Sequence, residues 1–176
     1  MEEARKLPRT SVSIFLNSRI AVIGAGSVGS QVIDALHSKG HRDIIATRTT
    51  EENLEDISNR YGINTTTDNG YAAQNSDIIV LAVKPDDVKK AAQQINGYAN
   101  NKLVISLAAA RSIDYIEELV GTRVSRVMTG VFVKDEVAAY TLGEESEKDR
   151  ATIQYIFGSN AKEVDENLLA DRTFIA

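Results

Sequence analysis

Three glycines near the start of the sequence have the spacing of a phosphate-binding turn. Gly24, Gly26 and Gly29 form the pattern G-x-G-x-x-G, which directly follows the apolar run 20–23 and opens a helical pattern. In this context the first glycine permits a tight turn, the second lets a pyrophosphate approach the backbone, and the third lets the helix pack closely on the strand. Because the first N–H groups of a helix attract anions, we expect the segment 24–29 to bind the pyrophosphate of a dinucleotide.

The residues after the second predicted strand indicate which dinucleotide is bound. An NAD site carries Asp or Glu about 20 residues after the glycines, whereas this chain has Arg48 and Thr49 there. A guanidinium fork binds a 2′-phosphate through charge-assisted hydrogen bonds. Glu51 and Glu52 are the alternative ribose partners, but Thr49 and Glu52 have the S/T-x-x-E spacing of a capping box, which predicts a structural role for Glu52. We therefore favour NADP over NAD.

The ends of three later strand-like runs complete the predicted site. Ligands of open parallel sheets lie beyond the carboxyl ends of the strands. Here those ends are followed by Lys84 and Pro85, by the alanines 108–110, and by Met128 and Thr129. The alanines leave room for a flat ring, and Pro85 suits the first turn of a helix, where its missing N–H costs nothing. The stop of an apolar strand at Lys84 and Pro85 therefore indicates a chain that turns along a cofactor.

From residue 19 onward, short apolar runs alternate with helical patterns. The predicted strands are 20–23, 44–46, 63–66, 77–83, 103–107, 123–128, 137–142 and 162–164. The predicted helices are 28–36, 54–61, 71–73, 88–95, 113–120 and a polar helix from about 144. Strands that are apolar throughout and alternate with helices indicate an α/β fold, a Rossmann-type doubly wound and mostly parallel sheet. We assign 19–164 to this dinucleotide-binding domain and 1–18 to an N-terminal arm or short helix.

The composition is ordinary for a globular protein and argues against several functions. The 176 residues carry a formal net charge of −5 without a Lys/Arg cluster, which argues against nucleic-acid binding. No apolar run reaches the ~20 residues that span a bilayer, so no membrane partner is expected. The chain has no cysteine, which excludes disulfides and thiolate chemistry and fits a cytoplasmic protein. His37 and His41 are predicted to lie at the surface, near a helix end that Gly40 terminates.

No group of side chains predicts a catalytic triad or a metal site, so the catalytic residues are unknown at this point. The acidic runs 114–118 and 144–149 are interpreted as solvated segments, the second at a helix start where negative charge is favoured. Arg111 is interpreted as a surface arginine, with a substrate carboxylate as its alternative partner.

Several short motifs occur in an order that points to one family. The glycine pattern, an Arg-Thr pair at 48–49, LAVKP at 81–85, VISLAA at 104–109, RVM at 126–128 and EVDE at 163–166 together resemble pyrroline-5-carboxylate reductase. The resemblance runs from about residue 20 to the end of the chain. It implies an oxidoreductase that reduces pyrroline-5-carboxylate, a small imine, to proline with NAD(P)H in the last step of proline synthesis. It also implies a homo-oligomer for the intact protein.

The resemblance adds positions to the cofactor site. It implies that 24–28 hold the pyrophosphate, that 48–49 hold the 2′-phosphate, and that 82–85 line the ribose and nicotinamide, with Ala108, Ala109 and Met128 near the ring. The expected NADP-binding residues are therefore Gly24, Gly26, Ser27, Val28, Gly29, Arg48, Thr49, Ala82, Val83, Lys84, Pro85, Ala108, Ala109 and Met128.

Two departures from the family pattern keep other functions open. The family usually reads SxAAG, and Ala110 stands where that glycine would be. The family's Met-Pro-Asn-Thr-Pro-Ala loop appears here as 128–133, with Thr129 and Gly130 in place of Pro and Asn. The alternatives are a non-catalytic NADP-binding module, or a reductase of similar fold with another substrate, such as a deazaflavin-dependent NADP reductase.

The last residues resemble the start of the family's helical dimerisation domain. We assign 165–176 to the beginning of that domain, which is otherwise absent or truncated here. On this interpretation the chain is mainly the cofactor-binding domain. It is expected to bind NADPH but to show negligible turnover of pyrroline-5-carboxylate by itself.

Overall fold

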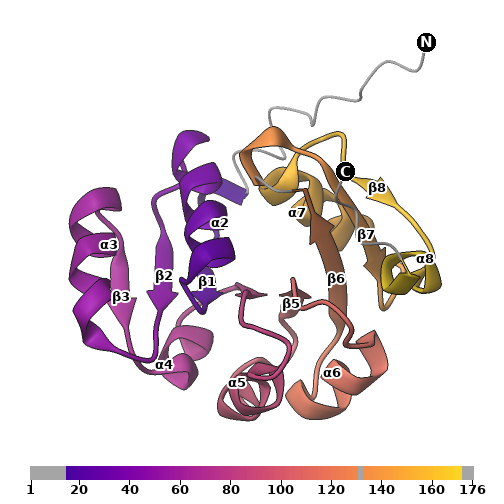
Figure 1. Cartoon of the computed structure of the whole chain (residues 1–176), viewed down its shortest axis with the longest axis horizontal. Coiled ribbons are helices and arrows are strands. Elements are labelled where there is room, and N and C mark those ends of the chain that lie inside the picture. Colours follow the sequence, from indigo (N-terminus) through magenta and orange to yellow (C-terminus); the bar gives the residue numbers. More distant parts are fainter. Residues whose placement is uncertain (1–14, 131–132, 172–176) are drawn as a thin grey trace.

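One sheet of eight strands runs through the residues that the structure describes, which are 15–130 and 133–171 of the computed structural model. The strands lie in the order β3-β2-β1-β4-β5-β6-β7-β8 (Figure 1). Their bounds are β1 Ile20–Ile23, β2 Ile44–Thr47, β3 Asn64–Thr66, β4 Ile78–Leu81, β5 Leu103–Ser106, β6 Val124–Thr129, β7 Ala138–Leu142 and β8 Lys162–Glu163. Each predicted strand is confirmed, with bounds that differ by at most two residues.

The helices connect these strands and cover both faces of the sheet (Figure 1). Their bounds are α2 Ser27–Ser38, η1 Glu51–Asn53, α3 Leu54–Tyr61, α4 Asn69–Gln74, α5 Val88–Ile95, α6 Ile113–Val120, η2 Val133–Asp135, α7 Glu147–Phe157 and α8 Glu166–Asp171. On one face the core includes Val32 of α2 and Ile153 of α7. On the other it includes Ala92 of α5 and Ile116 of α6. The doubly wound α/β fold is therefore confirmed.

The direction of the strands determines where a ligand can bind. β1 lies at the centre and pairs in parallel with β2 on one side and β4 on the other. β5 and β6 continue in parallel beyond β4, whereas β7 is antiparallel to β6 and β8 is parallel to β7. The chain order reverses between β1 and β4, and such a reversal opens a crevice at the carboxyl ends of the two strands.

The polar helix predicted from about residue 144 begins later and is not simply solvated. Ser146 is the N-cap of α7, and its side chain accepts a hydrogen bond from the backbone N–H of Asp149. Asp149 is buried and makes a bidentate ion pair with Arg123, at 2.7 Å and 3.1 Å. That contact raises the pKa of Arg123. The interpretation of Asp149 as a solvated acid is wrong, because Arg123 reaches it from the start of β6.

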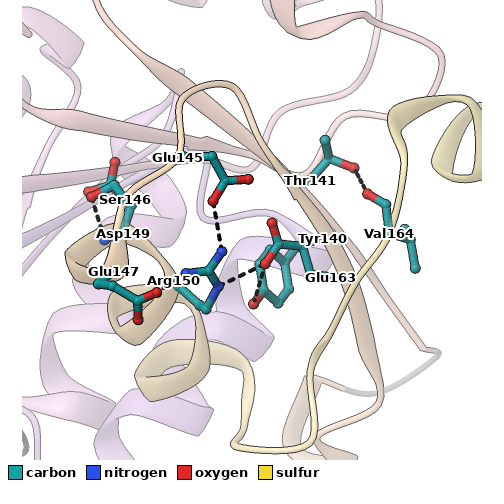
Figure 2. Close-up of polar contacts among 9 residues, drawn as sticks. All are labelled: Tyr140, Thr141, Glu145, Ser146, Glu147, Asp149, Arg150, Glu163 and Val164. Atoms are coloured by element: carbon teal, nitrogen blue, oxygen red, sulfur yellow. Dashed lines mark hydrogen bonds and ion pairs between the residues drawn. The ribbon is translucent and has the colours of Figure 1, made fainter.

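Arg150 organises the remaining acids of this region. Its guanidinium pairs with the exposed Glu145 and Glu147, and with Glu163 at 2.8 Å (Figure 2). Glu163 belongs to β8, so Arg150 ties α7 to the edge of the sheet. Burial is the main cause that raises the pKa of the neighbouring Tyr140 to about 12. In the other acidic run, Glu117 accepts a hydrogen bond from the N–H of Val124 at 2.9 Å, so it too has a structural role.

His41 is buried, and its predicted surface position is wrong. Its Nδ1 lies 3.0 Å from the hydroxyl of Tyr155, and its Nε2 lies 3.3 Å from the carbonyl oxygen of Asp43. The Tyr155 ring also stacks on Phe15, with ring centroids 5.1 Å apart. Gly40 follows the end of α2 as expected, but His41 then contacts Tyr155 of α7 instead of solvent. Burial lowers the pKa of His41.

The buried His41 predicts a loss of stability in acid. The unfolded chain protonates this ring below its ordinary pKa of about 6.5, whereas the folded chain resists protonation. The free energy of unfolding should therefore fall as the pH drops below about 6.5, by up to about 1.4 kcal/mol per pH unit from this residue alone. Urea unfolding between pH 7.5 and pH 5.5 measures the change.

The variant His41→Gln should lose this part of the pH dependence, since glutamine does not titrate. His37→Gln is the matched control, because it leaves the buried ring in place and should keep the wild-type slope. Equal slopes for the wild type and His41→Gln would contradict the assignment.

Candidate functional site

A cleft of about 590 Å³ lies at the carboxyl ends of β1, β2, β4 and β5. Its lining residues are Gly24, Gly26, Ser27, Val28, Arg48, Thr49, Ala82, Val83, Lys84, Pro85, Asp87, Leu107, Ala108 and Ala109. This volume lies within the ~300–1,000 Å³ typical of ligand pockets. The structure therefore brings together all the predicted site residues except Gly29 and Met128, and it adds Asp87 and Leu107, which the sequence reasoning missed.

The three glycines have the separate geometric roles expected from their spacing. Gly24 adopts φ +90°, and a Cβ added there would lie 2.7 Å from Cγ1 of Val83. A Cβ at Gly29 would lie 2.2 Å from the carbonyl oxygen of Gly24, so a glycine is needed for α2 to pack on the end of β1. Beside Gly26, by contrast, a Cβ would meet nothing within 4 Å. The open space at Gly26 is where a ligand can approach the backbone.

The N-terminus of α2 adjoins this open space without a cap of its own. Gly26 is the N-cap residue, and no side chain of the described residues bonds to the first N–H groups of the helix. Ser27 and Val28 of this first turn line the cleft. Free N–H groups together with the helix dipole favour an anion at this position. The local geometry therefore fits the pyrophosphate of a dinucleotide.

Arg48 places a positive charge at the β2 end of the cleft. Its backbone N–H lies 3.4 Å from the carbonyl oxygen of Thr66, but among the described residues its guanidinium makes no hydrogen bond or ion pair. Thr49 beside it is exposed. The capping box predicted for Thr49 and Glu52 is wrong, because η1 begins at Glu51 after Thr50 and no side chain caps it. Within this part of the chain, the Thr49 side chain thus has no capping bond that would compete with a ligand.

Two loops that follow adjacent strands form walls of the cleft, and Arg111 joins them. The residues 82–85 follow β4, and the residues 107–109 follow β5. Nε of Arg111 donates to the carbonyl oxygen of Pro85 at 3.0 Å, and its Nη2 lies 3.6 Å from the exposed Asp86. Arg111 is thus neither an ordinary surface arginine nor free to bind a carboxylate with its whole fork.

Pro85 itself does not stand in the first turn of a helix, contrary to the prediction. It lies in a turn in which the N–H of Asp87 bonds to the carbonyl oxygen of Lys84 at 2.9 Å, and α5 begins only at Val88. The proline therefore shapes the turn along the cleft wall, because its ring fixes φ near −65°. Lys84 and Asp87, two of the three charged residues of this turn, are exposed and line the cleft.

Met128, Thr129 and Gly130 are not among the residues that line the cleft. Met128 is half-buried in β6, where it pairs with Ala139. The N–H of Gly130 donates to the carbonyl oxygen of Val137 at 2.8 Å, which begins the connection to β7. The next two residues, Val131 and Phe132, lie outside the described residues. The expected position of Met128 near the nicotinamide ring stays a prediction.

Two other kinds of site are absent from the described part of the chain. Within 15–130 and 133–171, no group of three or more His, Cys, Asp and Glu side chains is arranged to hold a metal ion. No helix among these residues is long and apolar enough to cross a membrane.

Comparison with known proteins connects this geometry to a family. The family model described as "NADP oxidoreductase coenzyme F420-dependent" matches residues 19–110, slightly more than half of the chain. The chain is 36% identical over 121 residues to a pyrroline-5-carboxylate reductase of Methanosarcina acetivorans, a match that covers 65% of this chain and 45% of that relative. The chain spans about half the length of the curated relatives it matches.

Solved structures agree with these sequence matches. A pyrroline-5-carboxylate reductase from Coxiella burnetii superposes with a TM-score of 0.77 at 25% identity, over 86% of this chain and 61% of that one. The pyrroline carboxylate reductase of Plasmodium falciparum, solved with NADP bound, gives a TM-score of 0.70 at 23% identity, over 85% of this chain and 58% of that one. The second likeness supports the fold alone.

Ala110, at the end of the β5 wall, predicts a stabilising substitution. It is exposed and adopts φ +56°, a left-handed conformation that costs a non-glycine residue about 1–2 kcal/mol. Ala110→Gly removes this cost and restores the glycine of the family pattern. It also makes the unfolded chain more flexible, which lowers the free energy of unfolding by about 0.4–1 kcal/mol. A net gain of roughly 0.5–1 kcal/mol is expected from urea unfolding with an unchanged m-value.

The neighbouring Ala109→Gly is the control for that substitution. Ala109 is not among the described residues with positive φ, so glycine there should only lower stability. If Ala110→Gly destabilised the protein as much as Ala109→Gly does, the strain assigned to Ala110 would be refuted.

Proposed function

We propose that this chain, which belongs to the NADP oxidoreductase coenzyme F420-dependent family, binds NADPH in the cleft and serves a reductase of the pyrroline-5-carboxylate type. The observation that carries the choice of NADPH is the guanidinium of Arg48, which is unpaired among the described residues and lies at the end of β2, where an NAD site would have a carboxylate. The dinucleotide-binding domain is proposed to span residues 19–164.

The residues of the cleft divide into two groups with different tasks. Gly26, Ser27 and Val28 hold the pyrophosphate through the uncapped N-terminus of α2. Arg48 and Thr49 hold the 2′-phosphate, where a guanidinium fork can donate two parallel hydrogen bonds. The group at the pyrophosphate serves NADPH and NADH alike, whereas the group at the 2′-phosphate favours NADPH.

The two walls receive the nicotinamide half of the cofactor. The cofactor itself supplies the hydride, so the protein's task is to orient the ring and to exclude water. Ala82 and Val83 stand on one wall, Ala108 and Ala109 on the other, and their small apolar side chains leave room for a flat ring. Arg111 holds the spacing between the walls through the carbonyl of Pro85.

The substrate is proposed to be pyrroline-5-carboxylate, a small imine that is reduced to proline. The support is the name shared by several relatives at 30–36% identity. The whole enzyme is proposed to be a homo-oligomer, as the resemblance implies. A chain without cysteine fits the cytoplasm, where we propose that it acts.

A second candidate is a reductase of the same fold that acts on a different substrate. It is favoured by Thr129 and Gly130, which stand where the pyrroline-5-carboxylate reductase pattern has Pro and Asn. A third candidate is an NADP-binding module without catalysis, which rests on the same two residues. All three candidates share the proposed cofactor site, and they differ only in the step after the cofactor has bound.

The choice of cofactor is tested with Arg48→Ala. Removal of hydrogen bonds to a charged phosphate should weaken NADPH binding by about 1–3 kcal/mol and leave NADH binding nearly unchanged, since NADH lacks the 2′-phosphate. Titration of each dinucleotide by calorimetry gives the dissociation constants. Arg60→Ala is the matched control, because Arg60 is exposed on α3 and pairs with Asp34 outside the cleft. Equal losses for both dinucleotides in Arg48→Ala would defeat the assignment.

The reaction is tested by following NADPH absorbance in the presence of pyrroline-5-carboxylate. The measurement uses the protein at the length it has in its source organism, and oxidation that requires the imine is the expected result. A protein that binds NADPH but does not oxidise it with this substrate would contradict the first candidate. A panel of other small imines and carbonyl compounds would then separate the second candidate from the third.

A further inference from the structure

The start of the glycine turn is hydrogen-bonded to Thr47 through the N–H groups of Gly24 and Ala25. The N–H of Gly24 donates to Oγ1 of Thr47 at 3.1 Å, and the N–H of Ala25 donates to the carbonyl oxygen of the same Thr47 at 2.7 Å. Thr47 is the last residue of β2 and is 1% exposed. Two consecutive N–H groups of the turn are thus held by one residue of the neighbouring strand.

The Thr47 hydroxyl is fixed by a second contact on its other side. It donates to Oδ1 of Asn69 at 2.6 Å, and Nδ2 of Asn69 donates to Oε1 of Gln94 at 2.7 Å. Asn69 is the first residue of α4, and Gln94 lies in α5. A chain of three hydrogen bonds therefore connects the glycine turn to two helices on one face of the sheet.

The direction of these bonds follows from the chemistry of the groups. A hydroxyl has one donor and two acceptor sites, so Thr47 can accept from Gly24 and at the same time donate its own proton to another acceptor. Asn69 provides that acceptor, and its amide is oriented by the bond that it gives to Gln94. Valine has nearly the same shape as threonine but can make neither bond.

The geometry points to Thr47 as a positioning residue for the dinucleotide, and this inference rests on the proposed function. Thr47 does not line the cleft, and both sides of its hydroxyl are occupied, so it acts through Gly24. Gly24 adopts φ +90° two residues before the open backbone at Gly26. Thr47 holds the turn in the conformation that leaves this backbone accessible to the pyrophosphate.

This role makes a prediction that differs from that for Arg48. The pyrophosphate is common to both dinucleotides, so Thr47→Val should raise the dissociation constants of NADPH and NADH by the same factor, about tenfold. Thr47→Ser keeps the hydroxyl, so its dissociation constants for both dinucleotides should remain within about twofold of the wild-type values. Thr47→Cys offers only a weak acceptor, so its dissociation constants should lie between those of Thr47→Ser and Thr47→Val.

The experiment titrates NADPH and NADH into these variants well below their unfolding temperatures. Thr65→Val is the matched control, since it removes a threonine hydroxyl from the adjacent strand β3 without touching the glycine turn. If Thr47→Val fails to fold, the order wild type, Ser, Cys still tests the inference. A merely structural role would lower the unfolding temperature of Thr47→Val or Thr47→Cys while leaving both dissociation constants at wild-type values, and that result would overturn the inference.

Failure of this inference can be told apart from failure of the proposed function. A wild-type protein that binds neither dinucleotide would refute both. Wild-type binding that survives in Thr47→Val, together with the expected loss in Arg48→Ala, would refute only the role of Thr47. A loss confined to NADPH in Thr47→Val would also refute it, because the pyrophosphate would then not be the group affected.

Discussion

The close contact between α2 and the end of β1 is the constraint on which the cleft depends. Helix and strand can approach this closely only because Gly29 has no side chain, and any Cβ there would collide with the carbonyl oxygen of Gly24. With α2 in this position, its first N–H groups face the crevice between β1 and β4. The walls after β4 and β5 then enclose the space in front of them. Loss of this contact would separate the anion-binding turn from both walls.

Much of the architecture could be predicted because it depends on local patterns. Central strands that are buried on both faces must be apolar throughout, and this signal is visible over four residues in β1 or β4. Helix ends are similarly local. Gly62 adopts a left-handed conformation directly after α3, and α3 has the bounds of the predicted helix 54–61. The clustering of strand ends then follows from parallel pairing alone, which is why most of the cleft could be assigned before the structure was known.

The features that could not be predicted depend on partners far away in the sequence. Asp149 of α7 is buried because Arg123, 26 residues earlier and directly before β6, reaches it. His41 is buried because Tyr155 covers it from α7. A similar case is Arg126, which is 2% exposed and pairs with Glu166, forty residues later. A charged residue looks solvated in a local pattern, and only the tertiary structure shows whether an opposite charge or hydrogen-bond partner makes its burial tolerable.

The cleft is built from the ends of β1, β2, β4 and β5, whereas the turn that departs most from the family comes after β6. Among the described residues of that turn, Thr129 and Gly130 do not line the cleft. The contacts described for the glycine turn come from Thr47 and from the residues after β4, so a substitution at Thr129 or Gly130 leaves those contacts in place. A protein arranged in this way can inherit its cofactor site intact while its reactivity toward small molecules diverges. In this chain the complete G-x-G-x-x-G pattern at 24–29 and the residues 129 and 130 after β6 belong to different strand ends, so each can change by itself.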